Sequence, residues 1–411
     1  MILRSHNHPA YRQRLTERFG FLPSYFKSGG IVVHAASVGE VIALKPFIEA
    51  LLKKHHHLAI TITSFTPTGS EQVTKMFGDQ VQHCYLPLDI FPCTGLFLTA
   101  LKPKILVLME TELWPNLIAQ CHKKKVKLQL INGRLSDNSM KSYSKLKWLI
   151  QPCLRRFDTI LAQSHDNQAN FISLGAKPES CIVSGNLKFD LQLNANIEQQ
   201  QQTLKKLITH DRQVWLVAST HPGDEEIILS AFETLKNQYE NLLLILVPRH
   251  PERFDNIFQL CQQHGFSTVR RSEKIAVTLN NDIWLIDTLG ELLATCGLAD
   301  IVTMGGSFSA IGGHNPLEPA LFKKPIVVGH DMSNFRKVME QLTTKQGIEQ
   351  LTSDSSTPTT ELSRLLTDKV HQLLADDDKR LLLGNNAYLV VNENQGATAR
   401  SITALNVLLT Q

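Results

Sequence analysis

The stretch that decides the fold reads GGSFSAIGGHNPLEP and covers residues 305–319. Two glycine pairs, Gly305-Gly306 and Gly312-Gly313, bracket a turn that follows the apolar residues 301–304. Glycine lets the backbone turn sharply, and a helix N-terminus leaves backbone N–H groups without partners. A strand, a glycine loop and a helix start together therefore form a corner that attracts an anion.

A helix is expected to follow this loop, from Asn315 to Lys323. Asn315 suits the N-cap, Pro316 the first helical position and Glu318 the acidic position of a capping box. The same residues would also suit a tight βα turn with an ordinary cap and no ligand. Glycine loops of this kind are common in nucleotide-binding α/β folds, so the rest of the chain has to decide between the two interpretations.

The chain has 411 residues, more than one ordinary core accommodates, so two or three domains are expected. Hydrophobic residues make up 43% and charged residues 19%, as in soluble globular proteins. The seven cysteines include no C-x-x-C pair, which argues against disulfides or a zinc site and for a reducing compartment. No apolar run approaches the ~20 residues that span a bilayer and no signal peptide is visible, which favours the cytoplasm.

Charge is unevenly distributed, although the net charge is only +4. Residues 1–190 carry 23 Lys and Arg against 13 Asp and Glu, a balance of +10, while the remainder carries 19 against 25, a balance of −6. The first half is therefore expected to face nucleic acid, a lipid headgroup surface or a phosphorylated substrate. Aromatic residues reach only 7%, so nucleic acid is the weakest of the three partners.

Short apolar runs alternate with helical patterns along the whole chain. The expected strands of the first half lie at 31–35, 58–63, 104–109, 127–131 and 159–162, and those of the second half at 214–217, 242–247, 283–286, 301–302 and 325–328. Continuous apolar strands flanked by helices are typical of parallel sheets covered on both faces. We therefore expect an α/β protein with two Rossmann-like βαβ domains that face a central cleft.

The expected boundary is the stretch 191–202, which is polar, rich in glutamine and without hydrophobic period, as in a linker. The two domains are then 1–190 and 203–411. The last helix of the second domain could pack back on the first. Binding chemistry is expected at the carboxyl ends of the strands in both domains.

Two motifs of the first domain carry carboxylates at strand ends. HAASVGE places Glu40 in the first turn of a helix, where the helix dipole favours a carboxylate. Glu40 could be a general base or an ordinary helix-start glutamate. METELWPN ends a buried strand with Glu110 and Glu112, so at least one of these carboxylates should meet a cation or an active-site hydrogen bond.

Cations follow other strands. GNLKFD, residues 185–190, contains Lys188, which could meet an anionic substrate or lie on the surface. In the second domain STHPG begins at Ser219, PRHPERF at Pro248 and DTLGE at Asp287. The guanidinium of Arg249 is the natural fork for a phosphate or carboxylate.

Other catalytic constellations are weakly represented. The sequence contains no G-x-S-x-G or Walker A motif. His55-His56-His57 would diverge around a helix end, and Asp376-Asp377-Asp378 suits a helix cap better than a metal site. No metal is expected.

The motifs HAASVGE, TPTG at 66–69, METELWPN, NGRLS at 132–136, GNLKFD, PRHPERF and GGHNPLEP occur in this order. With them the chain closely resembles, over nearly its whole length, the bacterial 3-deoxy-D-manno-octulosonic acid (Kdo) transferases, which are GT-B glycosyltransferases of lipopolysaccharide assembly. The resemblance implies an inverting transfer of Kdo from CMP-Kdo onto the lipid A precursor lipid IVA, without metal or other cofactor, at the cytoplasmic face of the inner membrane.

The resemblance also implies roles for individual residues. Glu40 would accept the proton of the acceptor hydroxyl, and Glu110 and Lys188 would support the transition state. The residues implied to bind CMP-Kdo are Pro248, Arg249, Leu289, Gly290, Glu291, Asn315, Pro316, Leu317 and Glu318. Further candidates at the expected cleft are Ser37, Gly39, Thr66, Gly69, His221, Gly305, Gly306, Gly312 and Gly313.

One feature departs from the family. Its members usually begin with a hydrophobic membrane anchor, whereas this sequence begins near the basic segment Arg4–Arg18, so it is either truncated or docks without the anchor. An anionic membrane surface is expected to bind this segment and the Lys141–Lys147 cluster, at about 1 kcal/mol per well-placed cation. The alternatives are another GT-B enzyme acting on UDP-sugars, a sugar-nucleotide epimerase, or a non-catalytic lipid-surface binding module.

Overall fold

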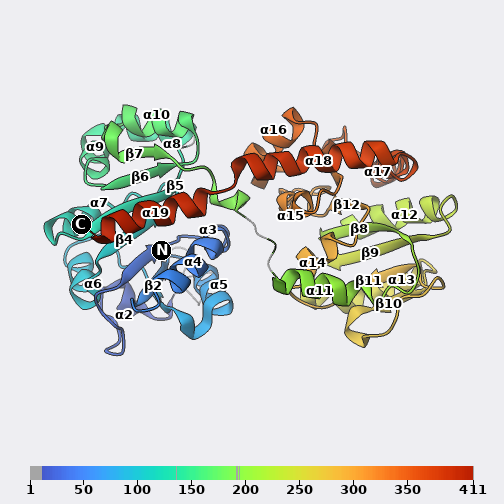
Figure 1. Cartoon of the computed structure of the whole chain (residues 1–411), viewed down its shortest axis with the longest axis horizontal. Helices are drawn as coiled ribbons and strands as arrows, with labels where there is room; N and C mark the ends of the chain where they lie inside the picture. The colour runs from blue at the N-terminus through green and yellow to red at the C-terminus, as the bar shows by residue number, and fades with distance from the viewer. Residues whose placement is uncertain (1–11, 136, 191–192, 194, 411) are drawn as a thin grey trace. The chain divides into compact units, whose positions relative to one another are not determined.

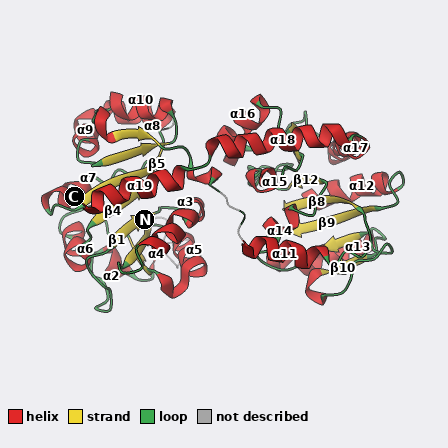
Figure 2. Cartoon of the chain, viewed as in Figure 1, coloured by secondary structure: helices red, strands yellow, loops and turns green. Residues whose placement is uncertain are grey.

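The computed structural model describes residues 12–135, 137–190, 193 and 195–410. The chain divides into two compact units (Figure 1). Unit 1 comprises Met1–Asp190 together with Asn394–Gln411, and unit 2 comprises Leu191–Glu393. Each unit is a parallel sheet with helices on its faces, as the two-domain α/β prediction requires (Figure 2).

The sheet of unit 1 has seven strands in the order β3-β2-β1-β4-β5-β6-β7, all paired in parallel. The order of the strands reverses at β1, because β2 lies on one side of β1 and β4 on the other. This reversal is the switch point of a doubly wound sheet. The strands are β1 Ile31–His34, β2 Ile60–Ser64, β3 Gln82–Tyr85, β4 Ile105–Met109, β5 Lys127–Gly133, β6 Thr159–Ala162 and β7 Cys181–Val183.

Two apolar layers cover this sheet, because successive strand residues point to opposite faces. One layer contains Ile31 and Val33 and packs on α3, α4, α5 and α19. The other contains Val32 and packs on α6, α7, α9 and α10. The helices of unit 1 are α2 Leu15–Arg18, α3 Val38–Ala43, α4 Lys45–Lys54, α5 Pro67–Phe77, α6 Cys93–Leu101, α7 Pro115–Lys123, α8 Asp137–Lys145, α9 Lys147–Leu154, α10 His165–Ser173 and α19 Ala397–Thr410, with 3₁₀ turns η2 Gly78–Gln80, η3 Pro178–Ser180 and η4 Leu187–Phe189.

The sheet of unit 2 also has seven strands, in the order β10-β11-β9-β8-β12-β13-β14, again parallel. Its switch point is β8, flanked by β9 and β12. The strands are β8 Gln213–Thr220, β9 Leu242–Pro248, β10 Thr268–Arg270, β11 Ile283–Leu285, β12 Ile301–Met304, β13 Ile326–Val328 and β14 Glu349–Gln350.

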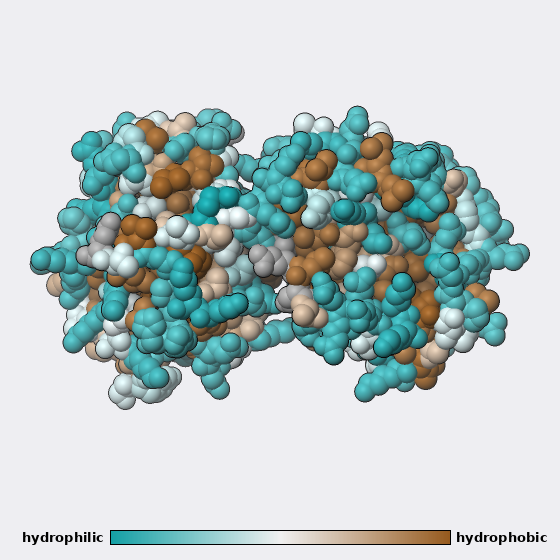
Figure 3. Space-filling model, in the orientation of Figure 1, coloured by the Kyte–Doolittle hydropathy of each residue, from teal (hydrophilic) through white to brown (hydrophobic). Residues whose placement is uncertain are grey.

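The core of unit 2 forms where α12, α13, α17 and α18 pack on the sheet around Trp215 and Phe232. Helix α14 makes further contacts with β8, and it also packs against α11 and α15. The helices are α11 Ala195–Lys205, α12 Asp224–Lys236, α13 Phe254–Gln263, α14 Leu292–Cys296, α15 Leu317–Leu321, α16 Arg336–Thr344, α17 Thr359–Ala375 and α18 Asp377–Asn394, with 3₁₀ turns η5 Pro251–Arg253, η6 Arg271–Glu273 and η7 Ser333–Phe335. Hydrophilic residues cover most of the visible surface of each unit (Figure 3).

The stretch 191–202, expected as a linker, is mostly helical. Residues 191, 192 and 194 lie outside the described part of the chain, and from Ala195 the chain forms α11. Its glutamines are exposed or half-buried, and of Ile197 and Leu204 only Leu204 is fully buried. One buried leucine is too weak a period to read from sequence, which explains why the prediction of a linker was wrong from Ala195 onward.

The last helix belongs to unit 1. α19 buries Ala397, Ile402, Leu405 and Leu408 in the layer that also holds β1 and α4. Asp190 fixes its start, because the carboxylate of Asp190 accepts hydrogen bonds from the backbone N–H groups of Gly396, at 2.6 Å, and Thr398. Carboxylates at helix N-termini are stabilised by the free N–H groups and the dipole there.

Candidate functional site

The predicted site residues of unit 1 all lie beyond the carboxyl ends of its strands. Ser37 and Glu40 follow β1, Thr66 follows β2, Glu110 follows β4 and Lys188 follows β7. In a parallel sheet these ends meet at one edge, where ligands of doubly wound folds bind. The topology therefore gathers these residues at the switch-point edge of unit 1.

Glu40 is held by three hydrogen bonds at the start of α3. Ser37 is the N-cap and accepts a bond from the Glu40 N–H at 3.4 Å. The Ser37 hydroxyl donates to Glu40 Oε1 and the Ala36 N–H to Oε2, each at 2.9 Å. Burial raises the pKa of Glu40, and the nearby carboxylates of Glu110 and Glu112 raise it further. The result is a fixed carboxylate with increased basicity, which suits a general base.

Glu110 has an unusual backbone conformation. Its φ is 57°, in the left-handed region that costs a non-glycine residue about 1–2 kcal/mol. Its N–H donates to the carbonyl of Ile131 on β5 at 3.0 Å, and Oε2 lies 3.1 Å from Arg134 Nε. Arg134, from the NGRLS motif, is therefore the cation that the buried carboxylates were predicted to need.

Glu112 lies beside a buried histidine. His34, the last residue of β1, is fully buried, and its Nδ1 is 2.9 Å from Thr63 Oγ1 on β2. Its Nε2 lies 3.8 Å from Glu112 Oε2. The Tyr143 hydroxyl donates to the Thr111 carbonyl at 3.4 Å, so α8 also contacts this loop. His34 and Tyr143 thus hold the loop after β4 from two sides.

Lys188 lies in η4, a short segment fixed at both ends. The side-chain carbonyl of Asn132, at the end of β5, accepts a bond from the Leu187 N–H at 3.0 Å. Asn186 accepts one from the Lys188 N–H, also at 3.0 Å. The bond to Asn132 ties this segment to the end of β5, and Lys188 beside it is partly buried.

The remaining candidates of unit 1 shape the helix starts. Thr66 caps α5 by accepting the Gly69 N–H at 3.1 Å. A Cβ added at Gly69 would lie 2.9 Å from Thr66 Oγ1, too close for an ordinary contact. A Cβ at exposed Gly39 would meet nothing within 4 Å, so the space above the first turn of α3 is open.

In unit 2 the glycine stretch turns tightly over the end of β8. The Gly305 N–H donates to the Ala218 carbonyl at 2.7 Å, and a Cβ at Gly305 would lie 2.6 Å from the Ser219 carbonyl oxygen. Asp224 Oδ2 accepts bonds from the N–H groups of Gly306, at 2.6 Å, and His221, at 2.9 Å. Burial raises the pKa of Asp224 to about 6. This one carboxylate joins α12, β8 and the glycine loop.

Three histidines gather at this corner. His221 and His314 stack with ring centroids 5.0 Å apart and Nε2 atoms 2.8 Å apart. His250 meets His221 edge to face at 5.1 Å. Burial, with a contribution from Arg249, lowers the pKa of His314 to about 4, and burial also lowers that of His221. Both rings are therefore neutral near pH 7, and one Nε2 donates its hydrogen to the other.

Arg249 and Glu318 form the charged part of the corner. Arg249 follows β9, is exposed, and donates its backbone N–H to the Thr220 carbonyl at 3.1 Å. Burial raises the pKa of Glu318 to about 7, and the charge of Arg249 and a bond to Asn315 oppose this rise. The guanidinium of the neighbouring Arg253 is neutralised within the protein, because it donates two hydrogen bonds of 3.0 and 2.8 Å to the buried carboxylate of Glu225. Arg249 is thus the guanidinium placed to meet an added anion.

The helix after the loop is shorter than predicted. α15 covers only Leu317–Leu321, and Pro316 occupies the N-cap instead of the first helical position. Asn315 still satisfies a helix-start donor, since its Oδ1 accepts the Leu317 N–H at 3.2 Å. The prediction of a helix over Asn315–Lys323 with a capping box was therefore wrong. Pro319 has no N–H to bond the Asn315 carbonyl, and the chain leaves the helix through turns in which Phe322 and Lys323 bond to the carbonyls three residues earlier.

Not every predicted residue can reach a ligand with its side chain. Pro248 and Leu317 are buried, so only their backbone is available. Leu289 is 63% exposed, and Gly290 has a φ of 85°. Glu291 is engaged with Arg271 at 2.9 Å and with Thr288.

Gly312 and Gly313 are required by their surroundings. Their φ angles of 91° and 70° lie in the region that favours glycine. A Cβ at Gly313 would lie 2.1 Å from Met332 Sδ, and one at Gly312 2.6 Å from Asn334 Nδ2. These glycines let the loop pack against the segment after β13.

Sequence reasoning missed three supporting residues: Arg134, Asn132 and Asp224. The first two lie in the NGRLS motif, and Asp224 follows a Pro-Gly pair at a helix start. Their residue types suggested cation, turn and cap, but not which distant backbone or carboxylate they contact. Those partners depend on the order of the strands.

The described residues contain no group of three or more His, Cys, Asp or Glu side chains placed to hold a metal ion. Among the helices of the described ranges, none is long and apolar enough to cross a membrane.

Two such sheets, with site residues at the carboxyl edge of each, define the GT-B class of glycosyltransferases and related epimerases. UDP-GlcNAc 2-epimerase from Neisseria meningitidis has a similar fold, with a TM-score of 0.57 and 17% identity, covering 93% of this chain and 100% of that one. A glycosyltransferase from Rickettsia africae gives a TM-score of 0.55 at 13% identity, covering 93% and 98%. At these identities the likeness shows the fold alone.

Comparison of sequences assigns the chain to one family within this fold class. Residues 13–191 match the family model described as 3-deoxy-D-manno-octulosonic-acid transferase (kdotransferase). The 3-deoxy-D-manno-octulosonic acid transferase of Haemophilus influenzae is 41% identical over 403 residues, 98% of this chain and 92% of that one. Those of Rickettsia felis and Bordetella pertussis are 37% and 31% identical, covering 74% and 91% of this chain and 64% and 86% of theirs. The chain belongs to the Kdo transferases, glycosyltransferases of lipopolysaccharide biosynthesis.

Proposed function

We propose that this Kdo transferase takes Kdo from CMP-Kdo and attaches it, with inversion at the anomeric carbon, to a hydroxyl of the lipid A precursor lipid IVA. Unit 1 binds the acceptor and unit 2 binds the donor. The observation that carries the proposal is Glu40, a carboxylate fixed at a helix start with a raised pKa and two further carboxylates beside it.

Glu40 removes the proton of the acceptor hydroxyl as the sugar oxygen attacks the anomeric carbon of Kdo. The C–O bond to the Kdo ring forms while the bond to the CMP phosphate breaks, and the phosphate leaves with the bonding electrons. Lys188 and Arg134 supply positive charge at the same sheet edge, where Glu110 orders Arg134. Such preorganised charge stabilises a transition state without reorganisation during the reaction.

The donor site in unit 2 consists of Arg249, the glycine loop and the start of α15. CMP-Kdo carries a phosphate and a carboxylate, and Arg249 is the guanidinium that no described carboxylate pairs with at this corner. The N–H groups of Gly305, Gly306 and Gly313 are bonded within the protein, to Ala218, Asp224 and Gly306, so these glycines fix the shape of the loop beside the donor. Neutral His221 and His314 offer ring edges for hydrogen bonds without added charge.

We further propose that the protein works at the cytoplasmic face of the inner membrane and needs no bound metal. Residues 4–11 of the proposed basic docking segment lie outside the described residues. Arg14 pairs with Glu17 at 2.8 Å, and Arg18 is buried, so neither is available to lipid. Exposed aromatic side chains follow instead, since Phe19, Phe21 and Tyr25 are 47%, 60% and 78% exposed. These apolar groups support docking on a bilayer that holds the acceptor.

Equilibrium binding of donors tests the proposal. Calorimetric titration of the full chain with CMP-Kdo, CMP and UDP-N-acetylglucosamine is expected to give binding for the two cytidine compounds and at least tenfold weaker binding for the uridine compound. A chain that prefers the uridine compound would instead be a UDP-sugar enzyme with the GT-B fold. A chain that binds none of them but binds lipid vesicles would be a lipid-surface module.

A further inference from the structure

Unit 1 has a basic hollow far from the residues assigned to transfer. It lies at the amino ends of β5, β6 and β7, where Lys127 begins β5, Asp158 precedes β6 and Ser180 precedes β7. β5 has seven residues, so this edge is ~20 Å from the carboxyl edge, at ~3.3 Å per residue. An occupant here cannot touch Glu40.

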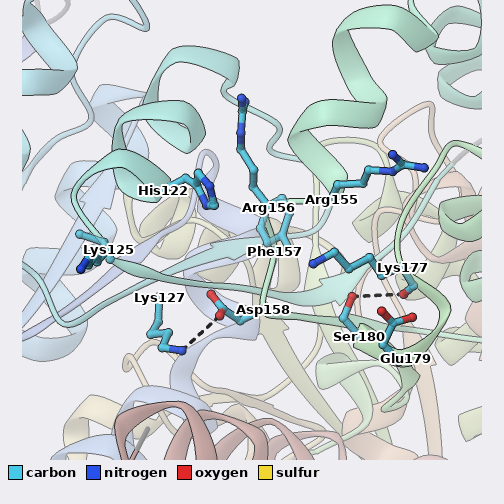
Figure 4. A pocket seen from close by; sticks show the side chains of 11 residues that line it. His122, Lys125, Lys127, Arg155, Arg156, Phe157, Asp158, Lys177, Glu179 and Ser180 are labelled. Carbon is cyan, nitrogen blue, oxygen red and sulfur yellow. Dashed lines mark hydrogen bonds and ion pairs between the residues drawn. The ribbon is translucent and has the colours of Figure 1, made fainter.

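The cavity holds about 700 Å³, within the ~300–1,000 Å³ range of small-molecule sites. Figure 4 shows side chains from three connections around it. The complete lining is His122, Lys125, Val126, Lys127, Arg155, Arg156, Phe157, Asp158, Lys177, Glu179 and Ser180. Val126 and Phe157 are buried and form its apolar floor.

Positive charge in this hollow is not balanced from within. The lining has five Lys and Arg side chains against two carboxylates. Asp158 is already engaged, because it lies 3.4 Å from Lys127 Nζ and accepts the Leu128 N–H at 2.8 Å. Among the described residues no hydrogen bond or ion pair engages the side chains of Lys125, Arg155 and Lys177. Like charges gathered in a concave site with apolar walls concentrate anions there.

We propose that this hollow binds a soluble, multiply charged phosphate compound. Several convergent cations fit phosphate oxygens, which accept charge-assisted hydrogen bonds from Lys and Arg. Membrane lipid fits less well, because none of the lining residues is among the exposed large hydrophobic side chains that would enter a bilayer. Nucleic acid fits less well, because the one aromatic ring, Phe157, is buried and cannot stack on a base.

The test uses the full-length chain carrying Arg249→Ala, which removes the anion-binding guanidinium of unit 2. The probe is inorganic pyrophosphate, titrated by calorimetry at constant ionic strength. One saturable site is expected. Combining Lys125→Gly, Arg155→Gln and Lys177→Gln is expected to weaken it at least tenfold. Lys125 has a φ of 57°, so glycine there removes the cation and relieves backbone strain.

The matched control removes three exposed lysines that do not line the hollow, by Lys53→Gln, Lys54→Gln and Lys123→Gln. This control is expected to bind pyrophosphate like its parent. Equal weakening in both triple variants would mean that only general charge attracts the anion, and would overturn the proposal. So would binding to phosphatidylglycerol vesicles that the pocket variant abolishes and pyrophosphate does not displace, since the occupant would then be a lipid headgroup.

Discussion

At the scale of single residues, the chemistry of unit 1 depends on how opposing effects set the proton affinity of Glu40. Burial and the charges of Glu110 and Glu112 raise its pKa, while bonds from the Ala36 N–H and the Ser37 hydroxyl lower it. The net shift is upward. A carboxylate fixed in position and more basic than usual is a better proton acceptor than a solvated one.

Replacing Glu40 by Gln keeps its shape but removes the base. We expect turnover to fall by ~10²–10⁴-fold, the usual loss when a general base is removed. Donor affinity should survive, because the donor residues lie in the other unit. Steady-state transfer kinetics and calorimetry measure the two effects, and a variant that keeps more than half of the activity would refute the assignment.

The neighbouring carboxylate should be visible in the pH dependence. Glu112→Gln removes a negative charge that raises the pKa of Glu40, so that pKa should fall. Glu40 then ionises at lower pH, and the acidic limb of the kcat/KM profile should move to lower pH. Glu71→Gln, an exposed position on α5, serves as control and should leave the profile unchanged. Movement to higher pH would contradict the assigned electrostatics.

In unit 2 the corresponding residue is Arg249. Arg249→Ala should weaken CMP-Kdo binding about tenfold or more, because a charge-assisted hydrogen bond contributes roughly 1.5–3 kcal/mol. Calorimetry with the acceptor should give nearly unchanged affinity. Arg336→Ala, an exposed arginine on α16, is the matched control. If donor affinity is the same in both variants, Arg249 has a structural role.

At the scale of elements, helix starts carry much of the site. α3 and α5 begin at hydroxyl caps, and the glycine loop leads into α15, where half-buried Glu318 lies in the first turn. Glu318 has a pKa of about 7 against an ordinary 4.5, so the folded state holds its proton more tightly than the unfolded state. The contribution of Glu318 to the stability of unit 2 is therefore fully present below pH 4.5 and is lost as pH rises through 7.

Glu318→Gln should remove this penalty. The difference in melting temperature between the variant and the parent should therefore grow in the variant's favour from pH 5 to pH 8. In free energy of unfolding this gain is about 1–3 kcal/mol at most. Glu233→Gln on the exposed side of α12 should show no such trend. A difference that shrinks with rising pH would mean that Glu318 is ionised and paired in the folded protein.

Sequence predicted most elements correctly because their apolar runs are long and uniformly buried. β4, Ile105–Met109, is buried at every position, and its run was found almost to the residue. It also placed Glu40 in the first turn of a helix, where α3 has it.

Contacts across the sheet could not be predicted. Arg134 pairs with Glu110, 24 positions away in the sequence. Asp224 accepts a hydrogen bond from Gly306, 82 positions away. α15 was predicted too long, because the turns that end it at Phe322 and Lys323 have no signal in the sequence.

At the scale of the whole molecule, the charge asymmetry bears on membrane docking. Unit 1 should bind vesicles with anionic lipid more strongly than neutral ones, and binding should weaken steeply with salt, since such attraction acts within ~8 Å at physiological ionic strength. Co-sedimentation across a salt series measures this. Phe21→Ala with Tyr25→Ala should lower binding at every salt concentration. Equal, salt-insensitive binding to both lipids would mean that apolar insertion alone holds the protein.

The central claim is that Kdo moves from CMP-Kdo to the lipid acceptor. The most direct measurement incubates the full chain with CMP-Kdo and lipid IVA, follows CMP release and lipid mass together, and determines the anomeric configuration of the product by NMR. The account predicts one CMP released for each Kdo attached, with a configuration opposite to that of the donor. Retained configuration, CMP release without a Kdo-bearing lipid, or transfer only from a UDP-sugar would contradict it.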